Sequence, residues 1–595
     1  MATEPRVWKR DRKLRLSYEV SHRIHCSSIY PIAAPNGSTV LLYGHEKGLR
    51  IVWRGGRRVR EQPPKSSRGR ANGLGRSEHA MMIDGDQDEY EGEEDEQDSD
   101  CPYPTITQDV DIEVGAAVLR IAVPSFPSLP FSPLLDLTKS HMFVALAYSN
   151  GMNTLFKIPL APPASYDRAV WVEKVIEEVA LSSDGSIAND LAIKILPVDG
   201  EPRAEAQDRL IAGQVLVAST AKAVNIWRLG LKADPTAKLE TSTDPIARLA
   251  LTGRKVSFHP SSGIAQLSIT DTSGAVRIFE LPALGTSTQR PSSRTSITSA
   301  HAVHGTERRW VTSYLTPFFS PDGTASLARR KKILDAKWIL GGRAIFALLH
   351  DGEWGIWSST STAVSNKNVD EDFAIHGFLG TSSTAEVADA GKQKKAGSKL
   401  APMTPNTRKA KAENLFSGSP RTPGTASTGG ISIAYTAHRS GQVDESLVLW
   451  YDGAIYSIPS VQAFWQRSTN NSSGSGFGSL YAPGLTHITD IDLMNEHITS
   501  ISQFASSAAQ TSSLGQMNTQ RDLLISAEHR FIIAQNLAPP TSSRPLFSAP
   551  APTELPPPAR DQLMLDAGEL DLGGMNRMLE HMANDAKTKR VGFAS

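Results

Sequence analysis

Three aspartates lie just before the turns of short apolar hairpins, where their carboxylates could be tested for acid–base chemistry. Asp351 and Asp452 each precede a glycine, and Asp271 lies three residues before Gly274. A carboxylate acts as a general acid or base only where it can reach the proton of a bound substrate. Aspartate at a tight turn more commonly accepts hydrogen bonds from the turn's own amides. The sequence therefore predicts structural roles for all three.

Other residue types that carry chemistry are scattered along the chain. His22 and His25 lie in or beside an expected strand and are interpreted as structural, and Cys26 and Cys101 are too few for a zinc site or a disulfide framework. The glycine-rich run 474–478 lacks the following helix that would direct amides at a phosphate. No nucleophile elbow, Walker loop or H-E-x-x-H motif is present. The sequence predicts a protein that is not an enzyme, with no catalytic, cofactor or metal residues.

The chain is organised around a repeated hairpin, whose clearest copy is Ile264–Leu281 with its turn at Ser273-Gly274. Glycine accepts the positive φ that such a turn requires. The other turns fall at Gly48, Gly151, Lys222, Gly352, Gly453 and, more faintly, Glu528. In six copies the fifth position after the turn is large and apolar: Trp53, Phe156, Trp227, Phe279, Trp357 and Ile458. A repeated hairpin buries both faces only by stacking on its neighbours. We predict an all-β, seven-bladed WD40-like β-propeller.

The spacing of the hairpins defines the expected domains. We predict a basic N-terminal tail at 1–13, the propeller at 14–540, a Pro-rich linker at 541–560 and a C-terminal helical segment at 561–587. Two polar stretches, 57–104 and 367–430, contain too few apolar residues to offset their ordering entropy and are predicted to be disordered insertions. The first is basic and then sharply acidic.

Four further segments are assigned to blades, two of them with an alternative. Leu14–Val20 alternates as a strand does and is expected to complete the last blade, although an outer strand of the first blade is the alternative. Val110–Val114 is assigned to the second blade and His487–Met494 to the seventh. Asp167–Leu181 fits an outer strand or a short helix.

Two features indicate regulation or binding. Met575, Met578, Leu579 and Met582 have helical spacing and form a stripe that packs either on the propeller's own rim or on a partner helix. Thr404, Ser419 and Thr422 each precede a proline in a basic stretch. Phosphorylation there would add negative charge, although such dipeptides are also common in linkers without any regulatory role.

Composition narrows the function classes. The formal net charge is zero, so nothing global favours nucleic-acid binding. The N-terminus lacks the apolar stretch of a signal peptide, and no run of about 18 apolar residues occurs. We expect a soluble intracellular protein without membrane insertion.

The blade pattern resembles WD-repeat proteins, and three stretches are more particular. The first blade (residues 17–56), LVLWYDGAIYSIPSVQAFW (447–465) and LDLGGMNRMLEHMA (570–583) are similar to the fungal form of the small WD-repeat nucleoporin in the Y-shaped outer-ring scaffold complex of the nuclear pore. The resemblance implies a scaffold subunit at the nuclear pore complex of the nuclear envelope. It implies binding to the large propeller-solenoid nucleoporin of the short arm, and in some organisms proximity to an ELYS-type subunit. It supplies no catalytic residue.

Two other functions remain open at this point. One is a WD-repeat subunit of a ribosome-biogenesis particle whose basic loops contact RNA. The other is an adaptor that recognises substrate proteins for modification. Both would use the same fold, so the sequence pattern of the blades does not separate them.

Overall fold

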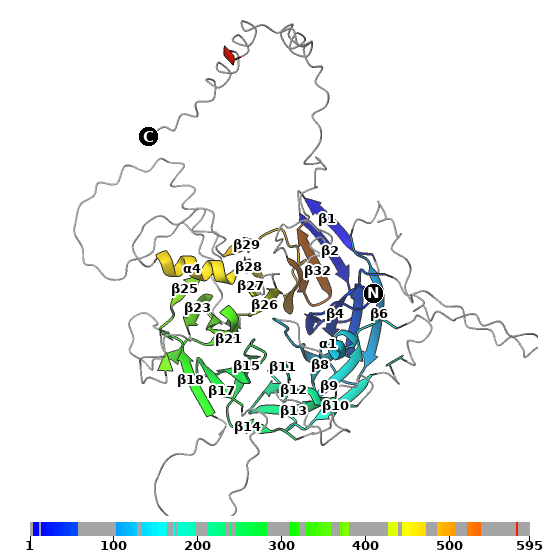
Figure 1. Cartoon of the computed structure of the whole chain (residues 1–595), viewed down its shortest axis with the longest axis horizontal. Helices are drawn as coiled ribbons and strands as arrows, with labels where there is room; N and C mark the ends of the chain where they lie inside the picture. The colour runs from blue at the N-terminus through cyan, green and yellow to red at the C-terminus, as the bar shows by residue number, and fades with distance from the viewer. Residues whose placement is uncertain are drawn as a thin grey trace, which may run out of the picture. The chain divides into compact units, whose positions relative to one another are not determined.

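The strands of the computed structural model form seven sheets of four or five strands arranged around one axis, and β19 (Phe318–Phe319) and β20 (Arg329–Arg330) form an additional two-stranded pair (Figure 1). The structure describes residues 4–10, 13–57, 103–127, 134–163, 171–172, 176–197, 211–232, 238–239, 244–281, 309–319, 329–358, 369–370, 372–379, 427–437, 443–471, 485–505, 521–536 and 579–580. Met1–Leu537 forms one compact unit and Ala538–Ser595 a second, of which only Leu579 and Glu580 are described. The predicted seven-bladed propeller is confirmed.

Each blade is an antiparallel sheet whose first strand faces the axis. Blade one contains β3 (Cys26–Ile29), β4 (Thr39–Gly44), β5 (Gly48–Arg54) and β6 (Ile106–Glu113), and blade two contains β7 (Val118–Ala122), β8 (His141–Tyr148), β9 (Asn153–Pro159) and β10 (Glu177–Leu181). Blade three contains β11 (Asp190–Pro197), β12 (Ile211–Thr220), β13 (Val224–Lys232) and β14 (Ala247–Leu249). Blade four contains β15 (Gly253–Phe258), β16 (Gln266–Asp271), β17 (Ala275–Glu280) and β18 (Arg309–Leu315), with β24 (Val369–Asp370) added in parallel.

The remaining blades complete the ring. Blade five contains β21 (Ile333–Ile339), β22 (Ala344–Leu349), β23 (Glu353–Ser358) and β25 (Ile375–Phe378), and blade six contains β26 (Gly429–Ala437), β27 (Val443–Tyr451), β28 (Ala454–Ile458) and β29 (Thr486–Ile488). Blade seven contains β30 (Ser500–Ala505), β31 (Arg521–Ser526), β32 (Arg530–Asn536), β2 (Lys13–Glu19) and β1 (Arg6–Arg10). Smaller elements are α1 (Leu134–Ser140), α4 (Val461–Asn471), a 3₁₀ turn at Leu340–Gly342, and the β19 (Phe318–Phe319) and β20 (Arg329–Arg330) pair.

The six large apolar positions of the repeat all lie in the third strand of a blade. Trp53, Phe156, Trp227, Phe279, Trp357 and Ile458 are each no more than 3% exposed. They pack into the hydrophobic clusters between neighbouring sheets. Their recurrence therefore follows from the need to fill the gaps between blades with large apolar side chains.

The N-terminal strand closes the ring. β2 pairs with β32, the last strand of the propeller, in seven antiparallel residue pairs from Lys13↔Asn536 to Glu19↔Arg530. Leu14, Leu16 and Tyr18 point into a core shared with blade one, where Tyr18 stacks on Phe531 with ring centroids 4.8 Å apart. The expectation that Leu14–Val20 completes the last blade is confirmed, and the alternative of an outer strand in blade one is wrong.

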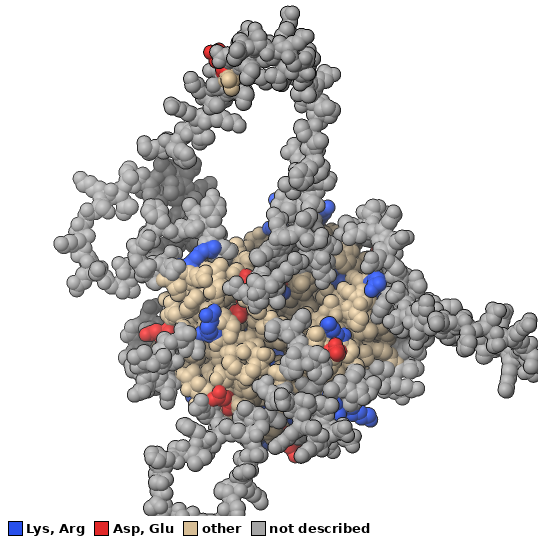
Figure 2. Space-filling model, in the orientation of Figure 1, with Lys and Arg blue, Asp and Glu red and all other residues tan. Residues whose placement is uncertain are grey.

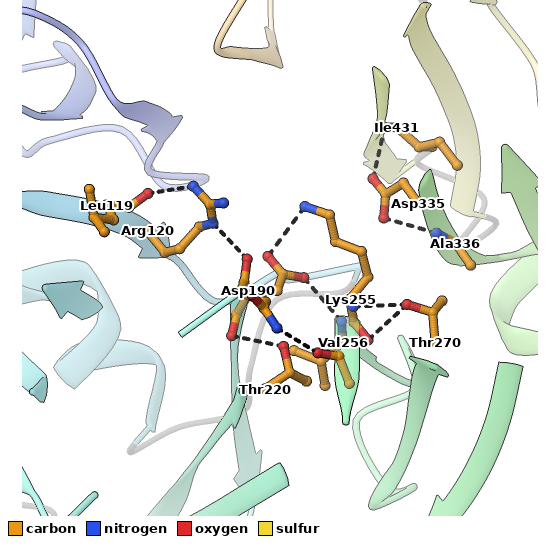
Figure 3. Close-up of polar contacts among 12 residues, drawn as sticks. Leu119, Arg120, Asp190, Thr220, Lys255, Val256, Thr270, Asp335, Ala336 and Ile431 are labelled. Atoms are coloured by element: carbon orange, nitrogen blue, oxygen red, sulfur yellow. Dashed lines mark hydrogen bonds and ion pairs between the residues drawn. The ribbon is translucent and has the colours of Figure 1, made fainter. Parts of the chain in front are cut away.

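The inner strands are joined across the blade junctions by individual hydrogen bonds. The inner edge of each first strand has no neighbouring strand, so its main-chain groups need other partners. Asp190 of β11 accepts a hydrogen bond from the Val256 N–H of β15 at 3.0 Å, and Asp335 of β21 accepts one from the Ile431 N–H of β26 at 2.9 Å (Figure 3). The other junctions use Cys26 to Val118 O, Arg120 to Asn189 O, Trp338 to Ser257 O, Gln503 to Ser432 O and Ser27 N–H to Ser500. All seven junctions are therefore bridged.

Four boundary predictions were wrong. The predicted basic tail 1–13 contributes β1 and the start of β2, because Val7 and Trp8 suit a strand beside the free edge of β2. Val110–Val114 belongs largely to β6 of blade one, where Val110 and Ile112 pair with Ile51 and Leu49. Within His487–Met494, only the first two residues are in a strand; they belong to β29 of blade six, which pairs with β28.

The fourth wrong boundary is that of the second insertion, because the predicted range 367–430 includes strand residues of blades five and six. Ile375–Phe378 forms β25 and pairs with β23, and β26 already begins at Gly429. In the ambiguous stretch 167–181, Glu177–Leu181 is the outer strand β10, although residues 167–170 and 173–175 lie outside the described residues. Most of 57–104 and 367–430, all of the linker 541–560, and all of 561–587 except Leu579 and Glu580 also lie outside them.

Removing side-chain volume at the closing strand should weaken the whole propeller. We predict that Leu16→Ala lowers the free energy of unfolding by about 2–5 kcal/mol, because Leu16 is fully buried between blades seven and one. Chemical denaturation followed by tryptophan fluorescence measures the change. Val7→Ala on the exposed strand β1 is the control and should change it by less than about 0.5 kcal/mol; equal effects would contradict the role of β2 in closure.

Two histidines with lowered pKa values should make the propeller less stable in mild acid. Burial, together with a smaller effect of nearby Lys157 and Lys194, lowers the pKa of His141 and of His259 to about 4. An unfolded chain takes up these protons near pH 6.5, before the folded chain does, so stability is lost as the pH falls from about 6.5 to 4. Melting temperatures measured across this range should fall, and less steeply in a His141→Gln/His259→Gln variant.

Candidate protein-docking surface

The turn aspartates have the structural roles that the sequence predicted. Asp271 accepts hydrogen bonds from the N–H groups of Ser273 and Ala275, each at 2.9 Å, and also pairs with Arg277. Asp351 accepts one from the Glu353 N–H at 3.1 Å. Asp452 accepts one from the Thr428 N–H at 3.1 Å. The carboxylates of Asp271 and Asp351 therefore shape their own turns, whereas Asp452 bonds the residue that leads into β26.

One group of side chains has the composition of a metal site but not its geometry. His22, His45 and Glu46 bring ligand atoms within 4.8 Å of one another. However, both ring nitrogens of His45 already have partners: Nε2 lies 2.9 Å from Asp111, and Nδ1 accepts a hydrogen bond from the Lys47 N–H. A buried histidine bonded at both nitrogens has no lone pair left for a metal, so this group stabilises the loop of blade one.

The central channel is lined by the first strands and encloses about 620 Å³. Its charged lining residues are bonded within the protein: Lys337 pairs with Asp335 at 3.9 Å, and Arg521 donates to the Thr436 hydroxyl at 3.2 Å. On the face shown in Figure 2, the described Lys and Arg side chains are scattered rather than gathered into one basic surface. Exposed apolar side chains are therefore the better candidates for a binding surface.

Blades four and five share a surface on which two exposed phenylalanines lie beside two cations. Phe318 is 49% exposed and Phe378 is 50% exposed. The Arg330 guanidinium lies 4.2 Å from the centre of the Phe318 ring, and Lys331 Nζ lies 5.5 Å from that of Phe378. We call Phe318, Arg330, Lys331 and Phe378 the aromatic–cation patch.

The patch is held between the hairpin turns of the two blades. Thr316 connects its parts, because its N–H donates to Gly274 O at 3.0 Å and its hydroxyl donates to Lys331 O at 2.7 Å. Arg330 donates to Thr316 O at 2.8 Å. Gly274 has φ of +85°, and a Cβ atom there would lie 2.6 Å from Lys331 O. Glycine is thus needed at this turn for both its conformation and the close approach of the patch.

Two acids fix the lysine of the patch. Lys331 Nζ lies 2.8 Å from Asp351 and 2.6 Å from Glu353. Although partial burial acts to lower it, the pKa of Lys331 is raised by these two carboxylates. The ammonium group is therefore charged and positioned before any partner arrives. Aromatic rings and arginine in fixed positions are enriched where proteins bind one another.

The sequence did not identify this patch. Phe378 falls inside the insertion predicted to be disordered, and no predicted hairpin includes Phe318. Of the predicted partner-facing helix, Leu579 is 60% exposed, whereas Met575, Met578 and Met582 lie outside the described residues. The same holds for Thr404, Ser419 and Thr422.

Comparison with known proteins gives the family. The model of the family described as Nucleoporin NUP37 N-terminal domain matches residues 17–534, which include strands of every blade. The chain belongs to this family. It is also 27% identical over 614 aligned residues to Nucleoporin NUP37 of Chaetomium thermophilum, covering 91% of this chain and 80% of that protein.

Family membership confirms the resemblance read from the three sequence stretches. The chain is a nucleoporin with a propeller scaffold, which places it at the nuclear pore complex in the nuclear envelope. Among the described residues, no helix is long and apolar enough to cross a bilayer.

The patch should contribute little to folding. We predict that Phe318→Ser/Phe378→Ser changes the free energy of unfolding by less than about 1 kcal/mol, because half of each ring is already exposed to water. Trp357→Ala, at a buried position of the repeat, should cost about 3–5 kcal/mol in the same denaturation experiment. A large loss of stability in the double variant would mean that the patch is a structural feature rather than a docking surface.

Proposed function

We propose that the chain is a non-enzymatic scaffold subunit of the Y-shaped outer-ring complex of the nuclear pore. Membership of the nucleoporin family is the observation that carries the proposal. In this role the propeller binds other subunits of the complex and supports pore assembly, and with it the transport of mRNA and protein. The described carboxylates and histidines discussed above are bonded within the fold, which agrees with a function that needs no reaction centre.

The proposed main partner is the large propeller-solenoid nucleoporin of the complex's short arm, with an ELYS-type subunit as a second partner. We assign the contact with the large subunit to the aromatic–cation patch. Burying two half-exposed phenylalanines excludes water from the rings, and the neighbouring Arg330 can pair with an acid on the partner. Because Asp351 and Glu353 already hold Lys331, and the Thr316 carbonyl already holds Arg330, little conformational entropy is lost on binding.

Two further elements are proposed to modify this interaction. The stripe at Met575, Met578, Leu579 and Met582 would pack on a helix of the partner, consistent with the exposure of Leu579. Phosphorylation at Thr404, Ser419 and Thr422 would reverse the local charge of a basic stretch and so regulate assembly.

Reconstitution tests the proposed function. The full chain and the large short-arm nucleoporin of the same species are mixed and separated by size-exclusion chromatography, and we expect them to elute as one complex. Tagged chain purified from cells should recover other pore scaffold subunits. Recovery of pre-ribosomal factors and rRNA without pore scaffold proteins would support the ribosome-assembly alternative, and recovery with a modifying enzyme and its substrates would support the adaptor alternative.

The patch assignment has its own prediction. We expect Phe318→Asp/Phe378→Asp to weaken binding to the large subunit at least 10-fold by calorimetry, because two carboxylates would be buried against the partner. Met152→Asp/Met494→Asp places the same charges at equally exposed apolar positions on other blades and should leave binding unchanged. If both variants lose affinity equally, or if the first loses none, the patch is not part of the interface. The proposed scaffold function would not be affected by that result.

A further inference from the structure

The outermost strand of blade seven, β1, is exposed along its whole length. β1 is a fifth strand added to a four-stranded blade, and all five of its residues are exposed. One edge of β1 pairs with β2 from Arg6↔Ser17 to Arg10↔Lys13. Within the described ranges no strand pairs with the opposite edge. A free strand edge presents unpaired N–H and C=O groups and can accept another strand.

Blade four shows that the outer edge of a blade in this molecule accepts an additional strand. β18 is its fourth strand, and β24 adds beside it in parallel through Ser313↔Val369 and Tyr314↔Asp370. The two segments are far apart in the sequence, so the addition does not depend on a tight hairpin. The edge of β1 offers a comparable position with no occupant among the described residues.

The side chains of β1 indicate what such a strand would contain. Successive residues of a strand point to opposite faces, so Trp8 lies on one face and Val7 on the other. They are 39% and 48% exposed. Natural edge strands are commonly protected from pairing by charge, but exposed tryptophan and valine beside the charge provide apolar contacts for a neighbouring strand.

The charge on the hairpin of β1 and β2 favours an acidic occupant. Arg6 pairs with Glu19 at 3.0 Å, and Lys13 pairs with Asp490 at 2.8 Å. Lys9 and Arg10 are additional exposed cations, so β1 itself carries three cations and no acid. A second copy of the chain would bring the same excess of positive charge and be repelled.

We propose that the free edge of β1 binds an extended acidic segment of another protein, which adds to blade seven as a sixth strand. Main-chain hydrogen bonds supply the affinity, acids opposite Arg6, Lys9 and Arg10 supply the charge match, and apolar residues between them contact Val7 and Trp8. The chain's own acidic run at 84–100 matches the charge, but it consists mainly of Asp, Glu and Gly, which are poor strand formers. This inference does not rest on the proposed pore function, because it depends only on the edge and its charges.

Fluorescence anisotropy with the full chain tests the proposal. The probe is a labelled eight-residue peptide of alternating valine and glutamate. We expect saturable binding that Arg6→Glu/Lys9→Glu/Arg10→Glu weakens at least 10-fold. Lys47→Glu/Lys222→Glu/Lys332→Glu makes the same change of net charge at exposed lysines on blades one, three and five, and should leave affinity within twofold. Equal affinity for the wild type and the β1 variant would overturn the proposal.

Hydrogen exchange separates strand addition from a purely electrostatic contact. On peptide binding, alternate amides of Arg6–Arg10 should gain protection, and peptide methylated at alternate nitrogens should bind at least 10-fold more weakly. If the amides gain no protection, or if the methylated peptide binds equally well, strand addition is overturned. Both measurements use the wild-type chain, so they remain decisive even if β1 fails to form in the charge-reversed variant.

A deletion variant tests for competing occupants. The chain without residues 84–100 should bind the peptide with unchanged affinity. Markedly tighter binding after this deletion would show that the chain's own acidic run occupies the edge. Dimerisation of the wild type that is lost in the β1 charge-reversed variant would show a second copy there. Either result would overturn the assignment to another protein.

Discussion

The pairing of the first long strand with the last is the interaction on which this structure depends. A ring of seven sheets is closed only if the first and last parts of the chain meet. Strand β2 closes this ring by pairing with β32 over seven residue pairs. The contact also buries Leu14, Leu16 and Tyr18 between blades seven and one. It joins residues more than 500 positions apart, so the loop entropy of closure must be recovered through this burial.

Closure at one junction fixes the geometry at the other six. Each first strand is bonded to its neighbour by a side chain or main-chain group that reaches across the junction, such as Asp190 to Val256 and Asp335 to Ile431. Hydrogen bonds weaken steeply when misaligned, so these bonds allow little change in the relative positions of neighbouring blades. The aromatic–cation patch spans the turns of blades four and five through Thr316, so its shape depends on the same relative placement of blades. A docking surface made of two blades is rigid only in a closed ring.

The sequence predicted the fold well where one local rule was sufficient. A glycine turn followed five residues later by a large apolar residue identified the hairpins, since Trp53, Trp227 and Trp357 each fill one gap between sheets. It assigned outer strands poorly: β6, β25 and β29 are short or partly polar, and their blade is decided by pairing with a distant strand. The patch was missed for a similar reason, because Phe318 and Phe378 are distant in the sequence and only folding places them against the adjacent residues Arg330 and Lys331. The family resemblance came from longer stretches and was confirmed over residues 17–534.

The central claim is that β2 is as stable a part of the ring as the strands of the blades that it joins. Native-state hydrogen exchange on the full chain measures this directly, since amides opened only by global unfolding exchange most slowly. The account predicts that the hydrogen-bonded amides of β2 between Leu14 and Tyr18 exchange as slowly as those of β31 and β32. Rapid exchange throughout β2, with the seven blades still protected, would contradict it.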